Sequence, residues 1–214
     1  MTFGPAAYRG GRAALVGLAR LWFRLEVRGK EHVPATGAFV LAPVHRSNLD
    51  FLLVSAVTSR RMRYMGKDSL WKNRRFGRLL TGMGAFPVRR GTADREALRQ
   101  CMEVIREGEP LVLFPEGTRQ SGPIVQPLFE GAAFVAGRTQ VPIVPVGIGG
   151  SERAMPKGSK VIRPVKVVMV VGAPLDPPAP TTEGGRPSRR AVHEVTERLH
   201  AEIQALFDAA QSAV

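Results

Sequence analysis

The sequence predicts an α/β fold: a single-domain sandwich with a mixed, largely parallel central sheet flanked by helices. Apolar runs of strand length alternate with amphipathic segments along the 214 residues, and this alternation is typical of such sheets. Several runs are apolar throughout, as expected for strands that are buried on both faces. A chain of this length, with an apolar content of 44%, is long enough for one domain with a sizeable core.

Residues 1–24 predict an N-terminal amphipathic helix that faces a membrane. The apolar stretch 13–27 is interrupted by Arg20 and Arg24, so it falls short of the ~18–20 uncharged residues of a membrane span. It also lacks the cleavage site of a signal peptide. A basic helix that carries Trp22 can lie on a membrane surface. A helix that packs on the core would show the same pattern, and both interpretations stay open.

Residues 25–175 predict the body of the domain. One amphipathic segment, 93–107, has an apolar face that contains Cys101, so we expect this cysteine to be a core residue and not a nucleophile. As the only cysteine, it excludes an intrachain disulfide. Strands are expected at about 25–28, 38–44, 62–66, 85–88, 111–114, 141–148 and 165–171, and helices at about 48–59, 93–107 and 132–138.

The C-terminal part predicts a linker and a final helix. Residues 176–190 are rich in proline and glycine, which is typical of an exposed linker and not of a second domain. In 191–214, apolar residues recur at helical spacing. We therefore expect this segment to be an amphipathic helix that packs back on the domain.

The charge of the chain implies an anionic partner. Lysine and arginine number 31 against 18 acidic residues, which gives a net charge of +13. Residues 60–90 contain ten of these cations and only Asp68 as an acid, which is ten minus one, or +9. Trp71, Leu79 and Leu80 are interleaved with them, a mixture that suits an anionic membrane. A plain solvated surface and a nucleic-acid site are the alternatives. Of these three, we expect an anionic membrane surface to be the partner of this stretch, and we expect no nucleic-acid partner.

The hexapeptide 45–50 (HRSNLD) lies between two apolar runs, 38–44 and 51–57, and therefore at a strand-to-helix corner. A histidine whose one ring nitrogen is bound by a carboxylate can use the other as a general base on a hydroxyl. His45 and Asp50 form such a pair. The alternative is structural: Ser47 and Asp50 have the spacing of a helix capping box. The two interpretations are compatible, because a capped first turn would also fix Asp50.

A second group of polar residues follows the apolar run 111–114. Gly117 would let the backbone approach a ligand closely, Thr118 supplies a hydroxyl, and Arg119 offers a planar fork suited to phosphate oxygens. The alternative is a glycine turn with a surface pair of Glu116 and Arg119. The sequence shows no phosphate-binding or dinucleotide glycine motif and no His/Cys cluster, so we expect no metal or cofactor. The glycine-rich segment 147–150 predicts a turn.

Taken in order, these motifs resemble the four motifs of the glycerolipid acyltransferases, the 1-acyl-sn-glycerol-3-phosphate acyltransferase (PlsC-type) family. The resemblance covers about residues 25–175. It rests on His45-x4-Asp50, on 67–89 with AFPVR at 85–89, on FPEGTR at 114–119 and on VPIVPV at 141–146. No single motif would be specific, but four in order are.

The resemblance implies transfer of a fatty acyl group to the free hydroxyl of a lysophospholipid, foremost 1-acylglycerol-3-phosphate, which gives phosphatidic acid. It implies acyl-CoA or acyl carrier protein as the donor and no covalent enzyme intermediate. It makes His45 the general base and Asp50 the residue that orients it. It implies a peripheral enzyme on the cytoplasmic face of the cell membrane. The positions that it assigns to substrate binding are Lys67, Arg89, Glu116, Gly117, Thr118 and Arg119.

Two departures from the family pattern keep the acceptor open. The residue before Gly131-Ala132 is Glu130 where many relatives have a basic residue, and Gln120 replaces the usual serine after the motif arginine. An acyltransferase for another lyso-lipid is therefore one alternative. A non-enzymatic basic protein that binds membrane or nucleic acid is an alternative of a different class.

Overall fold

The computed structural model describes residues 4–88, 95–159, 161–181 and 185–214. Its described strands form one sheet of seven, in the order β1-β7-β6-β2-β5-β3-β4. Every neighbouring pair is parallel except β6 and β7, which are antiparallel. The predicted mixed, largely parallel α/β sheet is therefore confirmed. The strands are β1 (Glu26–Arg28), β2 (Val40–Pro43), β3 (Arg63–Lys67), β4 (Ala85–Val88), β5 (Leu111–Val112), β6 (Ile143–Gly149) and β7 (Val168–Val171).

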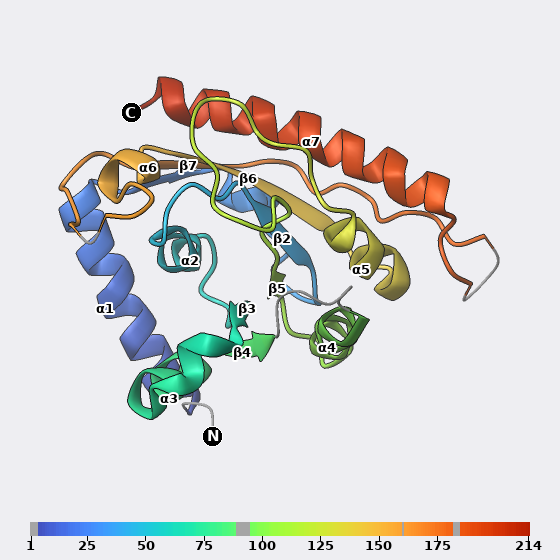
Figure 1. Ribbon diagram of the computed structural model, residues 1–214, viewed down its shortest axis with the longest axis horizontal. Helices are drawn as coiled ribbons and strands as arrows, with labels where there is room; N and C mark the ends of the chain where they lie inside the picture. The colour runs from blue at the N-terminus through green and yellow to red at the C-terminus, as the bar shows by residue number, and fades with distance from the viewer. Residues whose placement is uncertain (1–3, 89–94, 160, 182–184) are drawn as a thin grey trace.

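Helices cover the two sides of this sheet. In Figure 1 the long helix α7 runs along one side, over β6 and β7, while α1 and α2 lie on the other side. The helices are α1 (Pro5–Phe23), α2 (Asp50–Leu53), α3 (Arg74–Gly82), α4 (Arg95–Arg106), α5 (Gly131–Thr139), α6 (Ser151–Ala154) and α7 (Arg189–Ser212); the short 3-10 turns are η1 (Lys30–His32), η2 (Val54–Ala56) and η3 (Asp68–Lys72).

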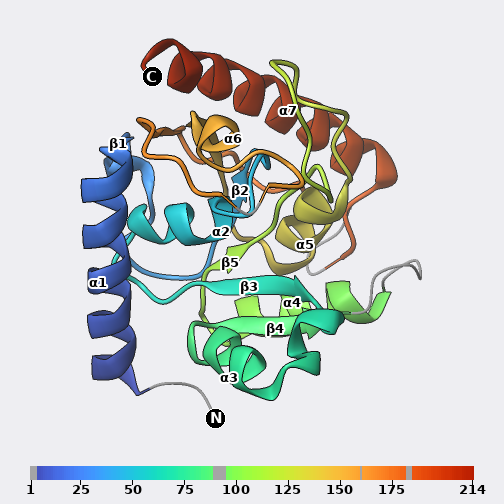
Figure 2. The same cartoon turned by 60° about the vertical axis from the view of Figure 1, so that its left-hand side comes forward.

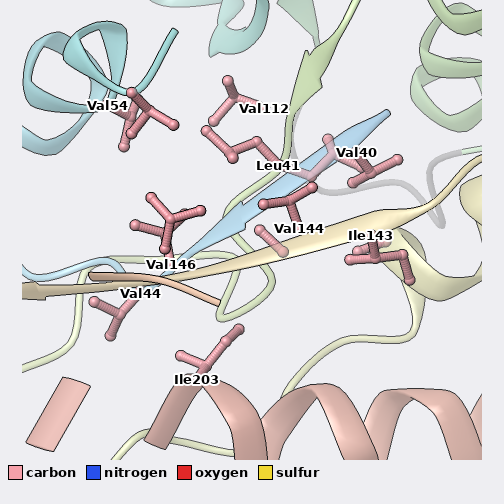
Figure 3. Packing of buried hydrophobic residues seen from close by; sticks show 14 of the residues in the cluster. Val40, Leu41, Val44, Val54, Val112, Ile143, Val144, Val146 and Ile203 are labelled. Carbon is pink, nitrogen blue, oxygen red and sulfur yellow. The ribbon is translucent and has the colours of Figure 1, made fainter. Parts of the chain in front are cut away.

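The core is centred on β2 and β6, the middle strands of the sheet. Leu41 of β2 pairs in register with Val144 of β6, and both are fully buried. Figure 3 shows Val54 approaching these strands from one side and Ile203 of α7 from the other. Burial on both faces explains why the strand sequences are apolar throughout. The same burial holds the end of β2 in place, and the polar hexapeptide 45–50 follows directly after that end.

The glycines at 147 and 149 belong to strand β6, so the predicted turn at 147–150 is wrong for its first three residues. A Cβ at Gly147 would collide with the backbone of Leu206, and one at Gly149 with that of Ala210. These glycines therefore let α7 approach the sheet closely. The chain leaves the strand only at Gly150, whose φ of 83° lies in the left-handed region.

Helix α1 has two apolar faces, which accounts for both interpretations of its sequence. Val16 and Phe23 are buried against the domain, and Arg12 Nε donates to the carbonyl of Ser55 at 2.9 Å. Trp22 remains exposed. Across residues 4–88, 95–159, 161–181 and 185–214, no helix has the length and apolar character needed to cross a bilayer.

Three predicted segments differ from the structure. The helix expected at 48–59 is α2 plus the 3-10 turn η2, because Val57 N bonds to Val54 O in a three-residue step and Ser55 O accepts Arg12. Strand β5 spans two residues where 111–114 was predicted. The linker 176–190 is not fully exposed: Pro178 is buried, and its carbonyl accepts Gln140 Nε2 at 3.2 Å.

The remaining predicted elements are confirmed. Helix α4 buries Cys101 completely, as expected for a core residue. Strand β7 pairs with β1 on one side and β6 on the other, which suits its continuous apolar run. The final helix α7 buries Val192, Leu199 and Ile203, so it packs on the domain.

Candidate active site

The polar motifs meet at the carboxyl edge of the parallel strands. His45 follows the end of β2, Lys67 ends β3, and Glu116 follows β5. Strand β5 lies between β2 and β3 and is parallel to both. The carboxyl ends of parallel strands face the same edge of a sheet, where loops build binding sites. The three motifs are therefore brought to one edge.

His45 is paired with Asp50. The Nδ1 atom of His45 lies 3.0 Å from Oδ2 of Asp50, and the Asp50 side chain is completely buried while His45 keeps 16% exposure. A carboxylate at Nδ1 fixes the tautomer with the proton on that nitrogen, so Nε2 carries the free lone pair. No described residue hydrogen-bonds to Nε2. The pair therefore presents a basic nitrogen towards solvent.

The same carboxylate also organises the turn, although the predicted capping box is not formed: α2 begins at Asp50, and its N-cap residue is Leu49, without a side-chain cap. Asp50 Oδ2 accepts the backbone N–H groups of Arg46 and Ser47, both at 2.7 Å. Ser47 Oγ accepts the N–H of Leu49 at 3.2 Å. Oδ2 of Asp50 therefore meets three donors, the imidazole and two backbone N–H groups, while the buried Oδ1 has no hydrogen-bond partner in the described part of the chain. One carboxylate thus orients the histidine and fixes the turn that bears it.

A buried ion pair lies behind the histidine. Arg46 Nη1 donates to both oxygens of Glu116, each at 2.8 Å, and the two side chains are 1% and 0% exposed. Arg46 Nη2 donates to the carbonyl of Ile124 at 3.1 Å. The guanidinium lies 4.8 Å from the ring centroid of Phe207 in α7. Buried charges need such partners, because each uncompensated one costs several kcal/mol; only Nε of this guanidinium has no hydrogen-bond partner among the described residues.

This pair fixes the backbone of His45. Glu116 Oε2 accepts the N–H of His45 at 2.9 Å, and the carbonyl of His45 accepts the N–H of Gln120, also at 2.9 Å. The imidazole stacks on Phe114, with 4.1 Å between ring centroids. Both oxygens of Glu116 are therefore engaged by protein donors, because Oε1 also accepts the N–H of Gln126 at 3.1 Å. We name His45, Arg46, Asp50 and Glu116 the site interior.

The next three residues form an exposed turn. Gly117 has a φ of 68°, and a Cβ there would collide with the ring of Phe129, so glycine is required on two grounds. Gly117 and Thr118 are exposed and Arg119 is half-buried. No described residue forms an ion pair with Arg119, so the surface pair of Glu116 and Arg119 considered from the sequence is not formed. We name Lys67, Gly117, Thr118 and Arg119 the site rim.

The other predicted cations are distributed differently. Lys67 is exposed at the end of β3, on the same edge as His45, while Arg89 lies outside the described residues. Within the basic stretch, Arg60 donates to the carbonyls of Pro34 and Gly37, and Arg63 pairs with Glu109 at 2.6 Å. These two cations therefore stabilise the fold and are not free for a ligand. The exposed cations of this stretch that the structure describes include Lys67, Lys72, Arg74, Arg75 and Arg78.

Arg46 is the site residue that the sequence did not single out. It lies between two motif residues and reads as one more surface arginine in a chain with 31 cations. The available signal was its position: an arginine directly after an apolar strand, in a hexapeptide expected to turn into a cleft. Only its burial shows that it pairs with Glu116.

The described residues offer little for other chemistries. Among them, no group of three His, Cys, Asp or Glu side chains is arranged to bind a metal ion. A cavity of about 270 Å³ is lined by Trp71, Arg74, Gly77, Arg78 and Thr81 around α3. None of the site residues lines it, so it is separate from the histidine.

Several known proteins resemble this chain. Residues 24–149, more than half of the chain, match the family model described as Acyltransferase. The chain is 28% identical over 183 residues to the 1-acyl-sn-glycerol-3-phosphate acyltransferase of Bacillus subtilis, across 85% of this chain and 87% of that protein. It is 29% identical to a chloroplastic enzyme of that name from Brassica napus, but spans only 44% of it. The crystal structure of PlsC, the 1-acyl-sn-glycerophosphate acyltransferase of Thermotoga maritima, superposes with a TM-score of 0.70 at 27% identity, covering 92% of this chain and 80% of that one.

Proposed function

The chain belongs to the acyltransferase family, and we propose that it transfers a fatty acyl group to the free hydroxyl of 1-acylglycerol-3-phosphate, which gives phosphatidic acid. The family resemblance stated from the sequence motifs is thereby confirmed, and with it the class of enzyme, an O-acyltransferase. The acceptor comes from the names of the relatives in Bacillus subtilis and Thermotoga maritima. The donor is acyl-CoA or acyl carrier protein.

The observation that carries the proposal is the pair of His45 and Asp50, 3.0 Å apart. The acceptor hydroxyl is a poor nucleophile until a base removes its proton. Nε2 of His45 takes that proton while the hydroxyl oxygen attacks the thioester carbonyl carbon. The tetrahedral intermediate then expels the thiolate, which takes the proton back from His45. Asp50 stabilises the imidazolium that forms between these two steps.

Glu116 positions the base in this mechanism. Its two oxygens bind Arg46, the His45 backbone and Gln126 N, so it acts on the substrate through His45. The rim residues receive the acceptor's glycerol phosphate: Arg119 with its planar fork, Thr118 with its hydroxyl, and the exposed backbone at Gly117. Lys67 adds a cation at the same edge. For Arg89 we retain the phosphate-binding role that the resemblance of its motif implies.

Two residues that differ from the family pattern, Gln120 and Glu130, bear on which head group the acceptor carries. Gln120 Nε2 donates to Thr118 Oγ1 at 3.1 Å, so the hydroxyl of Thr118 is oriented by a residue that differs from the family pattern. Glu130 lies 3.5 Å from His193 on the surface. A different lyso-lipid acceptor is therefore tested beside 1-acylglycerol-3-phosphate.

We also propose that the enzyme works as a peripheral protein on the cytoplasmic face of the cell membrane. Residues 1–24 face the lipid, 25–175 carry the chemistry, 176–190 connect, and 191–214 pack on the domain. Exposed cations interleaved with exposed Leu70, Phe76 and Leu79 support attraction to anionic head groups. Because this attraction is screened over about 8–10 Å at physiological salt, binding should weaken as salt rises.

The test is an acceptor panel with one labelled acyl group. Purified protein is given acyl-CoA or acyl carrier protein with 1-acylglycerol-3-phosphate, lysophosphatidylglycerol or lysophosphatidylethanolamine. We expect labelled phosphatidic acid, and a loss of about 10²–10⁴-fold in His45→Ala, the usual contribution of a positioned base. His193→Ala, which removes an exposed histidine of α7, is the matched control and should keep the wild-type rate. More than half the wild-type rate in folded His45→Ala would sink the mechanism.

A further inference from the structure

The cavity of about 270 Å³ beside α3 lies on one face of that helix. It is lined by Trp71 of η3 and by four residues of α3, namely Arg74, Gly77, Arg78 and Thr81. The four helical positions are spaced i, i+3, i+4 and i+7, which places them on one side of the helix. Figure 2 shows α3 beside β3 and β4, at the end of the sheet away from α7.

The indole of Trp71 forms a fixed wall of this cavity. Its Nε1 donates to Thr81 Oγ1 at 2.9 Å. A Cβ at Gly77 would lie 2.8 Å from Cδ1 of the indole, and one at Gly66 would lie 2.9 Å from Cζ3. The two rings of the indole therefore contact α3 and β3, respectively. Because these contacts exist in the free protein, the wall is formed before a ligand binds.

Two arginines bring positive charge to the cavity without an acidic partner. Arg74 and Arg78 are exposed, and neither forms an ion pair with any described residue. Helix α3 itself contains no acidic residue. Like charges at i and i+4 destabilise a helix, and Arg74 at its first position also opposes the helix dipole. An anion bound between the two guanidiniums would offset both effects.

We propose that this cavity binds the phosphate of the acyl donor, and we name Trp71, Arg74, Arg78 and Thr81 the α3 phosphate site. Acyl-CoA and acyl carrier protein both carry a phosphate ester at the far end of the pantetheine arm, so they offer the same chemistry. Guanidinium forks bind phosphate oxygens, and the face of the indole can receive the apolar part of the arm. The inference rests on the proposed acyl transfer and assigns its donor a place of its own.

The position of the cavity suits the donor and not the acceptor. Trp71 contacts β3 at Gly66, one residue before the end of the strand. Because β5 lies between β2 and β3, the ends of these strands are about 10 Å apart. In 1-acylglycerol-3-phosphate the reacting hydroxyl and the phosphate are on neighbouring carbons, so that phosphate must lie close to His45. The donor phosphate is separated from the thioester by the pantetheine arm, which spans about 15 Å when extended.

The opposite face of α3 provides a control. Arg75, Phe76 and Leu79 are exposed, and none of them lines the cavity. Attraction to anionic lipid can therefore use that face, while the donor uses the face with Arg74 and Arg78. Variants on the two faces separate the two roles.

Binding of coenzyme A tests the site without turnover. A ligand that binds the native state raises Tm, so coenzyme A should raise the Tm of the wild type. In Arg74→Ala/Arg78→Ala the Kd for coenzyme A should rise by about tenfold or more, because both forks are lost. The unliganded variant should be at least as stable as the wild type, since a like-charge pair is removed. The control Lys72→Ala/Arg75→Ala removes the same charge outside the cavity and should stay within about threefold of the wild-type Kd.

Kinetics distinguish the donor from the acceptor, and two forms of the carrier distinguish the source of the phosphate. In Arg74→Ala/Arg78→Ala the donor KM should rise by about tenfold, with the acceptor KM within about twofold. If acyl carrier protein is the donor, the form with the phosphopantetheine arm should bind the wild type more tightly than the form without it. The same double variant should lose that preference.

Four results would overturn the α3 phosphate site. They are wild-type protein that binds neither coenzyme A nor the carrier with its arm, an unchanged donor KM and Kd in Arg74→Ala/Arg78→Ala, an equal loss in the control variant, and a rise in the acceptor KM alone. Wild-type protein that binds coenzyme A through Arg74 and Arg78 but transfers no acyl group to any acceptor would instead overturn the proposed function.

Discussion

The site interior and the site rim lie a few residues apart in sequence but differ in every physical respect. In the interior, Asp50 and the pair of Arg46 and Glu116 are buried, and their charges are partnered by protein donors. In the rim, Thr118 is exposed, and Arg119 forms no ion pair with any described residue. The polar groups of the interior are engaged by other groups of the protein, whereas those of the rim are accessible to a ligand.

The difference separates positioning from recognition. Buried charges need ionic or hydrogen-bond partners, and the interior supplies them to each charged group, although Arg46 Nε and Asp50 Oδ1 have none of their own from the described residues. These contacts fix both the backbone and the ring of His45. An exposed cation is solvated in the free protein and can exchange water for phosphate oxygens. We therefore expect changes in the interior to lower kcat or stability, and changes in the rim to raise the acceptor KM.

The largest effect is expected from Asp50→Asn. The amide keeps the shape of the side chain but not the charge that stabilises the imidazolium, so kcat should fall by about 10²–10⁴-fold. If capping were the only role of Asp50, activity would survive and stability would fall slightly. Measuring kcat and Tm on the same preparation separates these roles. A wild-type kcat in this variant would contradict the role of the interior residues in positioning the base.

A large effect on stability is expected from Arg46→Met. The change leaves Glu116 charged, buried and without its guanidinium partner, which costs about 3–5 kcal/mol of unfolding free energy. Adding Glu116→Gln removes the charge and leaves an oxygen that can accept the N–H of His45. The double variant should therefore be more stable than Arg46→Met alone.

Urea unfolding of the two variants and the wild type makes this comparison. A double variant that is less stable than the single one would show that the pair does not act as a buried ion pair.

A smaller effect is expected from Arg119→Lys in the rim. Lysine keeps the charge but loses the fork that binds two phosphate oxygens, so the acceptor KM should rise by about tenfold with little change in kcat. Arg119→Ala should raise it further. Initial rates with each substrate varied in turn distinguish the two sites. A rise in the KM for acyl-CoA alone would assign Arg119 to the donor and reverse the substrate assignment.

Local sequence patterns determined a large part of this molecule. The alternation of apolar runs predicted the order of the strands and helices, because the periods of strand and helix are local properties of the chain. The spacing of His45 and Asp50 predicted their contact for the same reason, since both lie in one turn. The family resemblance extended the prediction to the acyl-transfer chemistry and to the rim residues.

Contacts between distant segments were decided only by the tertiary structure. The sequence does not show that Arg46 pairs with Glu116, which lies 70 residues further on, nor that Gly147 and Gly149 admit the backbone of α7. Each depends on the order and register of the sheet, which pair strands that are far apart in the chain. For that reason the sequence predicted the base, and the fold decided what positions it.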